Sequence, residues 1–229
     1  MNPDQLILAL DVSDAGVALD WVRRFNHQIG CFKIGLQLFT AQGPDFVREV
    51  RQTGAQVFLD LKLHDIPNTV AKAVEAACQL DIQYLTVHTL GGRAMLTAAL
   101  AAAAPTPRTM LLGITVLTSH DNDDLDDLGF DHTAAGQALL LAKLARSAGM
   151  RGLVCSPREV TLLRQELGTD FTLVTPGVRP AGAAVNDQNR VTTPAEAIAS
   201  GSSHLVIGRP ILNAPDPEQV IAGILSGGG

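Results

Sequence analysis

Charged side chains interrupt two apolar segments of the chain, and their types suit acid–base chemistry. Lys33 lies within residues 31–35, Asp60 and Lys62 interrupt the second segment, and Asp65 follows it. A charge inside an apolar strand costs several kcal/mol unless it is paired, so we expect these groups to pair with one another. Alternating lysine and aspartate keep each other ionised, and together they can supply a proton and a fixed negative field. We therefore interpret the set as catalytic rather than as ion pairs that only stabilise the fold.

Two glycine-containing loops near the carboxyl end of the chain suit the binding of a phosphate group. One is Pro176-Gly177-Val178-Arg179 and the other is Gly208-Arg209-Pro210. Glycine allows close approach to the backbone, and arginine makes bidentate, charge-assisted contacts with phosphate. The long, weakly patterned segment 176–193 also contains Asn186, Asp187 and Gln188, which could reach a bound ligand. We interpret this segment as a loop that closes over the ligand.

The elements that must position these residues alternate along the whole chain. Short β-branched runs predict strands, and the segments between them have helical spacing. The expected strands are Leu6–Leu10, Cys31–Ile34, Val57–Leu61, Tyr84–His88, Met110–Val116, Gly152–Cys155, Thr172–Thr175 and His204–Ile207. The expected helices are Asp14–Asn26, Pro44–Thr53, Pro67–Leu80, Arg93–Ala103, Ala134–Ala148, Pro157–Leu167, Pro194–Ser200 and Asp216–Leu225. The sequence Thr193-Pro194-Ala195-Glu196 predicts a capping box with proline at the first helical position.

This alternation predicts an α/β fold, a single-domain (β/α)8 TIM barrel over residues 1–229. An open, doubly wound sheet is the second choice, although such sheets usually have fewer strands. The terminal residues 226–229 are expected to be frayed. In a barrel the active site lies at the carboxyl ends of the strands, where Asp11, Lys33, Asp60 and Lys62 fall. Asp60 and Lys62 are two residues apart, so they should share the face of one strand.

Length and composition limit the possible class of protein. The chain has 229 residues, of which 46% are hydrophobic and 17% charged, with a formal net charge of −6. This composition excludes wholesale disorder, and no apolar run reaches the roughly 20 residues of a membrane helix. Without a basic cluster, nucleic acid is not expected as a partner. The amino terminus has no basic region typical of a signal peptide, so we expect a cytoplasmic protein.

Three other groups of polar residues predict no chemistry. The cysteines Cys31, Cys78 and Cys155 form neither a CxxC pair nor a zinc pattern, so we interpret them as buried, reduced thiols. His88 ends a strand and is interpreted as a structural or interface residue. The acidic stretch 121–127 fails the calcium-loop pattern, because its sixth position is Asp126 and its twelfth is His132. We interpret it as a solvated acidic loop or the start of a helix.

One segment resembles a family signature, namely Asp60-Leu61-Lys62-Leu63-His64-Asp65-Ile66-Pro67-Asn68-Thr69-Val70. It is similar to that of the orotidine 5′-phosphate decarboxylases. Further matches in the family's order are Leu10-Asp11, Phe32-Lys33-Ile34-Gly35, Leu117-Thr118-Ser119, Thr175-Pro176-Gly177-Val178-Arg179, Asp187-Gln188 and Ile207-Gly208-Arg209-Pro210. The resemblance covers nearly the whole chain. It implies conversion of orotidine 5′-phosphate to uridine 5′-phosphate and CO2, the last step of de novo UMP synthesis, with no metal and no organic cofactor.

The resemblance also implies a role for each matching residue. Lys62 would protonate the carbanion left by loss of CO2, Asp60 would lie beside the substrate carboxylate, and Lys33 and Asp11 would contact the ribose. Thr118 or Ser119 would contact the pyrimidine. The remaining substrate-binding residues would be Pro176 together with the phosphate ligands Arg179, Gln188, Gly208 and Arg209.

The resemblance further implies a homodimer with shared active sites, in which Asp65 and Thr69 serve the neighbouring subunit. The alternatives are an Mg²⁺-dependent sugar-phosphate decarboxylase of the same suprafamily, a nucleotide-binding barrel without catalysis, and an isomerase barrel. The metal-using relatives carry an acidic ligand where Lys33 stands, and a lysine there repels a divalent cation. The complete set of Lys33, Asp60, Lys62 and Asp65 disfavours the other two.

Overall fold

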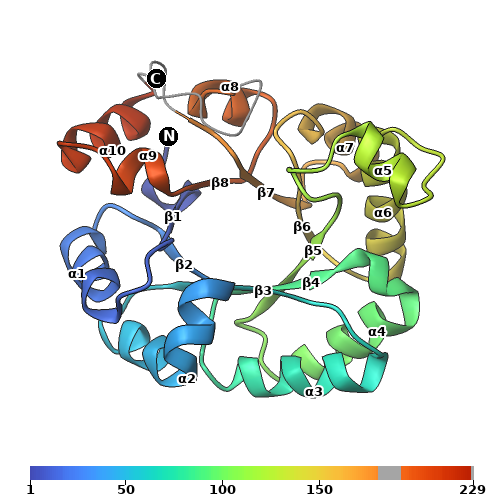
Figure 1. Cartoon of the computed structure of the whole chain (residues 1–229), viewed down its shortest axis with the longest axis horizontal. Helices are drawn as coiled ribbons and strands as arrows, with labels where there is room; N and C mark the ends of the chain where they lie inside the picture. Colours follow the sequence, from blue (N-terminus) through green and yellow to red (C-terminus); the bar gives the residue numbers. More distant parts are fainter. Residues whose placement is uncertain (180–191, 228–229) are drawn as a thin grey trace.

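Eight parallel strands form a closed barrel in which each strand pairs with the next along the chain, and β1 also pairs with β8 (Figure 1). The computed structural model describes residues 1–179 and 192–227. The strands are β1 (Leu6–Ala9), β2 (Cys31–Gly35), β3 (Val57–Leu63), β4 (Tyr84–His88), β5 (Met110–Ile114), β6 (Gly152–Val154), β7 (Thr172–Pro176) and β8 (His204–Ile207). The predicted (β/α)8 barrel is confirmed, and the open sheet is excluded because β1 and β8 close the ring.

The helices surround the barrel (Figure 1). They are α1 (Ala15–Phe25), α2 (Leu36–Gln52), α3 (Pro67–Cys78), α4 (Gly92–Ala103), α5 (Asn122–Asp127), α6 (Ala134–Ala148), α7 (Val160–Leu167), α8 (Pro194–Ala199), α9 (Arg209–Leu212) and α10 (Pro217–Ser226), with 3₁₀ turns η1 (Pro3–Gln5) and η2 (Thr89–Gly91). The predicted capping box is present, because Thr193 accepts a hydrogen bond from the Glu196 amide and the Glu196 carboxylate accepts one from the Thr193 amide. None of the helices among the described residues has the length and apolarity needed to cross a bilayer.

Three elements differ from the expectation. Helix α2 begins at Leu36 rather than at Pro44, because two helical segments join at Gly43, whose φ of 70° breaks the regular helix. Proline at position 44 disfavours a helical conformation for the residue before it, so only the second segment shows in the sequence. The short helix α9 gave no periodic signal. At the carboxyl end, α10 extends to Ser226, one residue beyond the expected Leu225, and residues 228–229 lie outside the described part of the chain.

The acidic stretch 121–127 forms the short helix α5, in agreement with its interpretation as a helix start. The Asp121 carboxylate accepts a hydrogen bond from the Asp124 amide, and the Asp124 carboxylate accepts one from the Asp121 amide. This reciprocal cap satisfies two amides that the first turn of a helix leaves without partners. Leu125 is buried against Val116 and Leu141, which anchors the acidic turn to the barrel.

Alternation along the strands divides the core into two layers. Leu6 and Leu8 of β1 pack toward the helices, whereas Ile7 and Ala9 point into the barrel. The interior is filled by Ile7, Ala9, Cys31, Phe58, Tyr84, Leu112, Val174 and Val206. These side chains form a packed core beneath the carboxyl ends of the strands, as is usual in this fold.

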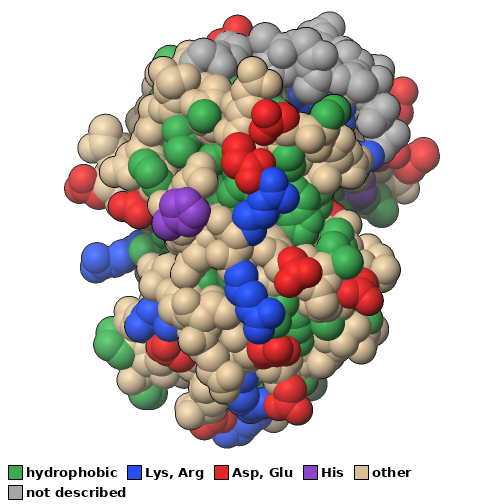
Figure 2. Space-filling view, turned by 90° about the vertical axis from the view of Figure 1, so that its left-hand side faces the viewer, with side chains coloured by type: hydrophobic (Ala, Val, Ile, Leu, Met, Phe, Trp, Pro, Cys, Tyr) green, Lys and Arg blue, Asp and Glu red, His purple; other side chains and the backbone are tan. Residues whose placement is uncertain are grey.

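Acidic and basic side chains are interspersed on the outer face shown in Figure 2, and no continuous basic patch appears there. On the outside of the barrel, an ion pair joins Arg24 of α1 to Glu218 of α10, with 2.5 Å between Nη2 and Oε1. Both side chains are about half exposed, so the pair contributes little to stability.

Candidate active site

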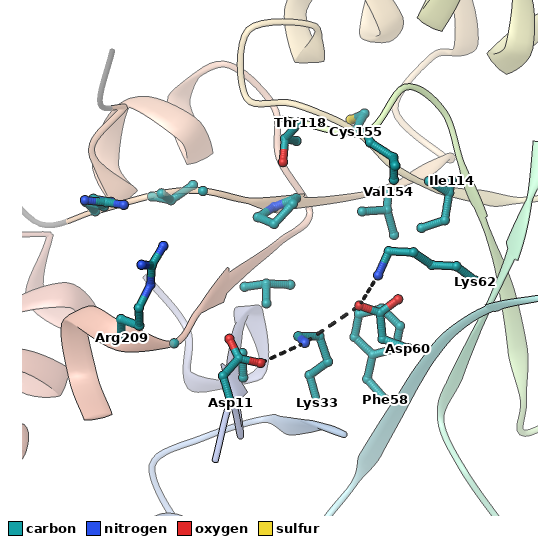
Figure 3. Close-up of a pocket in the computed structure, with 18 of the residues that line it drawn as sticks. Asp11, Lys33, Phe58, Asp60, Lys62, Ile114, Thr118, Val154, Cys155 and Arg209 are labelled. Atoms are coloured by element: carbon teal, nitrogen blue, oxygen red, sulfur yellow. Dashed lines mark hydrogen bonds and ion pairs between the residues drawn. The ribbon is translucent and has the colours of Figure 1, made fainter. Parts of the chain in front are cut away.

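A cavity of about 280 Å³ opens at the carboxyl ends of the strands. Its polar lining comes from β1 to β3 on one side and from the ends of β7 and β8 on the other (Figure 3). The predicted residues that line it are Asp11, Lys33, Asp60, Lys62, Thr118, Pro176, Arg179, Gly208 and Arg209. The cavity therefore lies where active sites of (β/α)8 barrels lie.

Four charged groups form an alternating line along one wall of this cavity (Figure 3). The Lys62 ammonium donates to Asp60 Oδ2 at 2.8 Å, and Lys33 Nζ lies 3.7 Å from the same oxygen. On its other side, Lys33 Nζ lies 3.3 Å from Asp11 Oδ1. Opposite charges at these separations stabilise one another, and the effect is strongest where water is excluded.

Burial decreases from the centre of this line toward its ends. The Asp60 and Lys33 side chains are 11% and 13% exposed, whereas those of Lys62 and Asp11 are 33% and 50% exposed. The buried carboxylate of Asp60 is held between two ammonium groups, while Lys62 reaches into the cavity. An ammonium group has three donors, so Lys62 keeps hydrogens for a ligand after pairing with Asp60.

The backbone at Lys62 has an uncommon conformation. Its φ is 49°, in the left-handed region that non-glycine residues rarely adopt. The register between β3 and β4 shifts at this point, because Leu59 pairs with Leu85 but Leu63 pairs with Val87. Bulges of this kind redirect a side chain next to active sites. The irregular backbone thus directs the Lys62 side chain over the cavity, and the regular alternation of side chains along a strand does not account for this position.

Thr86 of β4 is a residue of the site that the sequence analysis missed. Its hydroxyl accepts a hydrogen bond from the Lys62 amide at 2.8 Å and donates one to Asp60 Oδ1 at 2.9 Å. The residue is completely buried. The available signal was a polar residue within the otherwise apolar Tyr84-Leu85-Thr86-Val87, but threonine is common in strands.

An apolar wall lies across the cavity from Asp60 and was also missed (Figure 3). Its side chains come from β5, β6 and the segments that follow them, namely Ile114, Val116, Leu117, Val154 and Cys155. Burial raises the pKa of the Cys155 thiol far above its ordinary value, so this thiol is neutral. The three cysteines are free and buried, as predicted.

Asp65 and Thr69 do not line the cavity of their own chain. Both residues are exposed, and Asp65 Oδ1 accepts a hydrogen bond from the Ile66 amide at 2.6 Å. Strand β3 ends at Leu63, so the chain leaves the barrel wall before it reaches Asp65. The expected pairing of Asp65 with Lys33, Asp60 and Lys62 is therefore not found within one chain.

Thr118 and Ser119 are separated by the structure. Thr118 lines the cavity, whereas Ser119 lines a neighbouring cavity of about 340 Å³ to which Thr118 also contributes. Thr118 is therefore the better placed of the two to meet a ligand beside Lys62. Glu159 lies in the neighbouring cavity, where burial raises its carboxyl pKa to about 7 although its carboxylate accepts a hydrogen bond from the Ser156 amide.

The arginine end of the cavity lies opposite Lys62 (Figure 3). Arg179 is 7% exposed, whereas Arg209 is exposed on the first turn after β8. A Cβ atom at Gly208 would come within 3.1 Å of Asp11 Oδ2 and 3.2 Å of Ala9 Cβ, so a glycine keeps this corner open. Gln188, with Asn186 and Asp187, lies outside the described residues.

His88 is buried beside the site, but its electrostatic environment disfavours a charge. Burial, followed by like-charge repulsion from His64, Lys62 and His120, lowers its pKa to about 4. The His88 ring stacks on His64 with centroids 5.3 Å apart, and its Nδ1 accepts a hydrogen bond from the Leu90 amide. The interpretation of His88 as a structural residue agrees with these contacts.

Comparison with known proteins places this geometry in a family. The model of the Orotidine 5'-phosphate decarboxylase / HUMPS family matches residues 4–224. An orotidine 5'-phosphate decarboxylase of Syntrophotalea carbinolica is 51% identical over 220 residues, covering 93% of this chain and 90% of the relative. Another, from Opitutus terrae, is 52% identical over 222 residues and covers 96% of each chain.

Solved structures agree with the sequence relatives. The crystal structure of orotidine 5'-phosphate decarboxylase from Lactobacillus acidophilus superimposes with a TM-score of 0.85 at 37% identity, covering 98% of each chain. The match includes the closed barrel and extends over nearly all of the sequence. The chain belongs to the Orotidine 5'-phosphate decarboxylase / HUMPS family.

Proposed function

We propose that this chain decarboxylates orotidine 5′-phosphate to uridine 5′-phosphate, with Lys62 as the proton donor. The observation that carries the proposal is the array of Lys33, Asp60 and Lys62 at one end of a cavity whose other end holds arginines. The array suits a reaction that develops negative charge on carbon, and the arginines suit a phosphate group. The reaction is the last step of de novo UMP synthesis.

The chemistry of the substrate explains why a lysine is needed at this place. Cleavage of the bond between the pyrimidine ring and its carboxylate releases CO2 and leaves the electron pair on the ring carbon. That pair lies in the plane of the ring and cannot delocalise into the π system, so a nearby cation must stabilise it. Lys62 supplies the cation and then transfers one proton to the carbon, which completes uridine 5′-phosphate.

Asp60 and Lys33 keep the array ready for this step. Asp60 holds the Lys62 ammonium at 2.8 Å and lies where the substrate carboxylate would enter, while Lys33 neutralises part of its charge. Lys33 and Asp11 would bind the ribose, and Thr118 would bind the pyrimidine. Because these groups are positioned before the substrate arrives, little reorganisation is needed during the reaction.

Binding of the phosphate takes place away from the bond that breaks. Arg179, Gly208 and Arg209 would hold it, with Pro176 beside them and Gln188 as a further ligand. Interactions with a remote group can be used to position the reacting end and so lower the barrier. We expect no metal, because the Lys33 ammonium stands where metal-using relatives carry an acidic ligand and would repel a divalent cation. The resemblance to the family implies no organic cofactor.

The test is turnover of orotidine 5′-phosphate, followed spectrophotometrically with and without a chelator. We expect decarboxylation that exhaustive chelation leaves unchanged. A large loss of activity that Mg²⁺ restores would instead favour the metal-dependent sugar-phosphate decarboxylases. Arg209→Ala should lower kcat/KM for orotidine 5′-phosphate by the equivalent of roughly 2–4 kcal/mol. It should have little effect on kcat/KM for a substrate without phosphate.

We further infer a homodimer in which Asp65 and Thr69 of each subunit serve the neighbouring active site. Their exposure at the rim of the barrel, beside the exposed Ile66, supports this assignment. Residues 1–229 would then be one catalytic domain per subunit, acting in the cytoplasm.

Mixing two inactive variants tests the shared site. Lys62→Ala and Asp65→Ala homodimers should each be nearly inactive. After subunit exchange, each mixed dimer has one site with both changes and one with neither. Random pairing makes about a quarter of all sites intact, so activity should rise toward about a quarter of wild type. Verified exchange without recovery would show that Asp65 acts in its own chain.

A further inference from the structure

Thr86 connects the two groups that the proposed function places at the reacting bond. Its hydroxyl oxygen accepts from the Lys62 amide at 2.8 Å, and its hydroxyl hydrogen points to Asp60 Oδ1 at 2.9 Å. A hydroxyl has one hydrogen to donate, so the donor of Thr86 is committed to Asp60. Thr86 is fully buried and is absent from the cavity-lining residues within the described chain, so its contact with a ligand would be indirect.

These two hydrogen bonds act on different degrees of freedom. The bond to Asp60 Oδ1 fixes the rotation of the carboxylate, which leaves Oδ2 facing Lys62 Nζ at 2.8 Å and Lys33 Nζ at 3.7 Å. The bond from the Lys62 amide holds that residue at φ 49°, where a non-glycine residue is strained. Such a conformation persists only where its surroundings enforce it.

The interruption of the hydrogen-bonded ladder between β3 and β4 explains why the Lys62 amide needs a side chain as its acceptor. Between the pairs Leu59–Leu85 and Leu63–Val87 the register shifts, and the Lys62 amide bonds to a side chain of β4. A partly buried amide without a partner would be costly, and here the Thr86 hydroxyl takes the place of a backbone acceptor.

We propose that Thr86 is a positioning residue for decarboxylation, which orients Asp60 and holds the backbone of Lys62 in its left-handed conformation. This inference rests on the proposed function, since it assigns the reacting proton to Lys62. It predicts that loss of the hydroxyl misplaces the ammonium group while the arginine end of the cavity stays intact. The effect should therefore appear in kcat much more than in KM.

The experiment compares Thr86→Val, which keeps the shape and removes the hydroxyl, with Thr86→Ser, which keeps the hydroxyl. Thr109→Val is the matched control, because Thr109 is also buried and its hydroxyl donates to Ile82 O at 2.8 Å, at the opposite end of the barrel. We expect Thr86→Val to lower kcat on the order of 100-fold with little change in KM. Thr86→Ser should retain most of the activity, and Thr109→Val should retain the wild-type kcat even if it is less stable.

A second measurement does not depend on activity. Hydrogen exchange at the Lys62 amide should be slow in the wild type and in Thr86→Ser, and fast in Thr86→Val relative to the neighbouring amides of β3. If Thr86→Val does not fold, Thr86→Ala removes the same hydroxyl, and the same expectations apply to it.

The possible results separate the two proposals. A wild-type protein that does not turn over orotidine 5′-phosphate contradicts the proposed function, while the exchange measurement still tests the hydrogen bond of Thr86. If the wild type is active, a Thr86→Val variant with unchanged kcat overturns the positioning role. So does a Thr86→Ser variant as impaired as Thr86→Val, because that result would show that the methyl group and not the hydroxyl matters.

Discussion

At the carboxyl ends of the strands, lysines and aspartates pair with one another around a cavity, whereas at the amino ends a partly buried arginine donates hydrogen bonds to the backbone. Arg164 of α7 donates hydrogen bonds to the carbonyl oxygens of Gly168, Thr169, Phe171 and Gly201, and one to Ser203 Oγ. These partners precede β7 and β8, so one guanidinium joins the entry points of two strands. Burial lowers the Arg164 pKa, although arginine stays charged at physiological pH.

The charged residues at the two ends of the barrel have different roles: those at the carboxyl ends take part in the reaction, and Arg164 at the amino ends stabilises the fold. The donors of Arg164 are used on backbone carbonyl groups and one hydroxyl, so the arginine has a structural role at the end of the barrel without the active site. The Lys62 ammonium has one aspartate partner and faces a cavity, and its backbone is strained. Replacing groups at the amino ends of the strands should therefore affect the stability of the fold. Replacing groups at the carboxyl ends should affect the reaction.

Replacing the proton donor should give the largest effect. Lys62→Ala removes both the cation and the proton, so kcat/KM should fall by at least about 10⁴-fold. Thermal unfolding should change little, because Asp60 keeps Lys33 as a partner. Activity assays combined with calorimetry test this pair of expectations. A Lys62→Ala variant that loses most of its stability along with its activity would contradict the assignment of separate roles to the two ends of the barrel.

The opposite result is expected at the amino ends. Arg164→Met removes the charged donor of two partly buried carbonyl groups and of the Ser203 hydroxyl, and should lower the free energy of unfolding by about 3–5 kcal/mol. The folded fraction should keep the wild-type kcat. Urea unfolding measures the loss, and Arg24→Met is the control, since Arg24 forms an exposed ion pair worth at most about 1 kcal/mol. Equal losses in the two variants would contradict the stabilising role of Arg164.

Glu159 sharpens the comparison, because it is a buried acid at the catalytic end that lacks the pairing seen for Asp60. Its pKa rises from 4.5 to about 7 on folding, chiefly through burial. The folded protein therefore binds the proton more tightly than the unfolded chain between these values, and stability falls as pH rises from 4.5 to 7. Glu159→Gln keeps a hydrogen-bond acceptor for Ser156 and removes the charge.

The stability of Glu159→Gln relative to wild type should thus increase by about 2–3 kcal/mol between pH 4 and pH 8. Urea unfolding across this range measures the difference. His88, whose pKa is lowered to about 4, changes stability in the opposite sense, but it is present in both proteins and cancels. A pH-independent difference would mean that folding does not raise the pKa of Glu159.

The smallest effect concerns the strain at Lys62. At φ 49° a Cβ atom is unfavourable, so Lys62→Gly should be more stable than Lys62→Ala by about 1 kcal/mol. The exposed helical residue Ala101 of α4 provides the control, since Ala101→Gly should lower stability by a similar amount. Both differences are measured by urea unfolding. If glycine destabilises both sites alike, the backbone at Lys62 is not strained.

The sequence predicted the barrel well because each strand and the helix after it form a local unit with its own periodicity. All eight expected strands are present, and none of their ends differs from the expectation by more than two residues. The kink at Gly43 and the four residues of α9 were missed, because periodicity needs a longer, uninterrupted segment.

The charged residues of the site were easier to predict than their neighbours. Lys33, Asp60 and Lys62 stand out because charge inside an apolar strand requires a reason. Thr86 does not stand out, and its contacts depend on a register shift between two strands that neither strand shows alone. The apolar wall of Ile114 and Val154 has the same composition as any barrel core, so its place beside the ligand becomes apparent only in three dimensions.

The pairing of β1 with β8 has a consequence for how the protein is made. Leu6 pairs with Leu205, and Asp11 shares one cavity with Arg209, so both the ring and the site join the first and last parts of the chain. At ordinary translation rates of about 5–20 residues per second, β1 waits roughly 10–40 s for its partner. During that time β1 and the newest strand present unpaired edges, which are templates for association with other chains. The nascent chain is therefore most exposed to aggregation before β8 is synthesised, and chaperone binding during synthesis should concentrate on that interval.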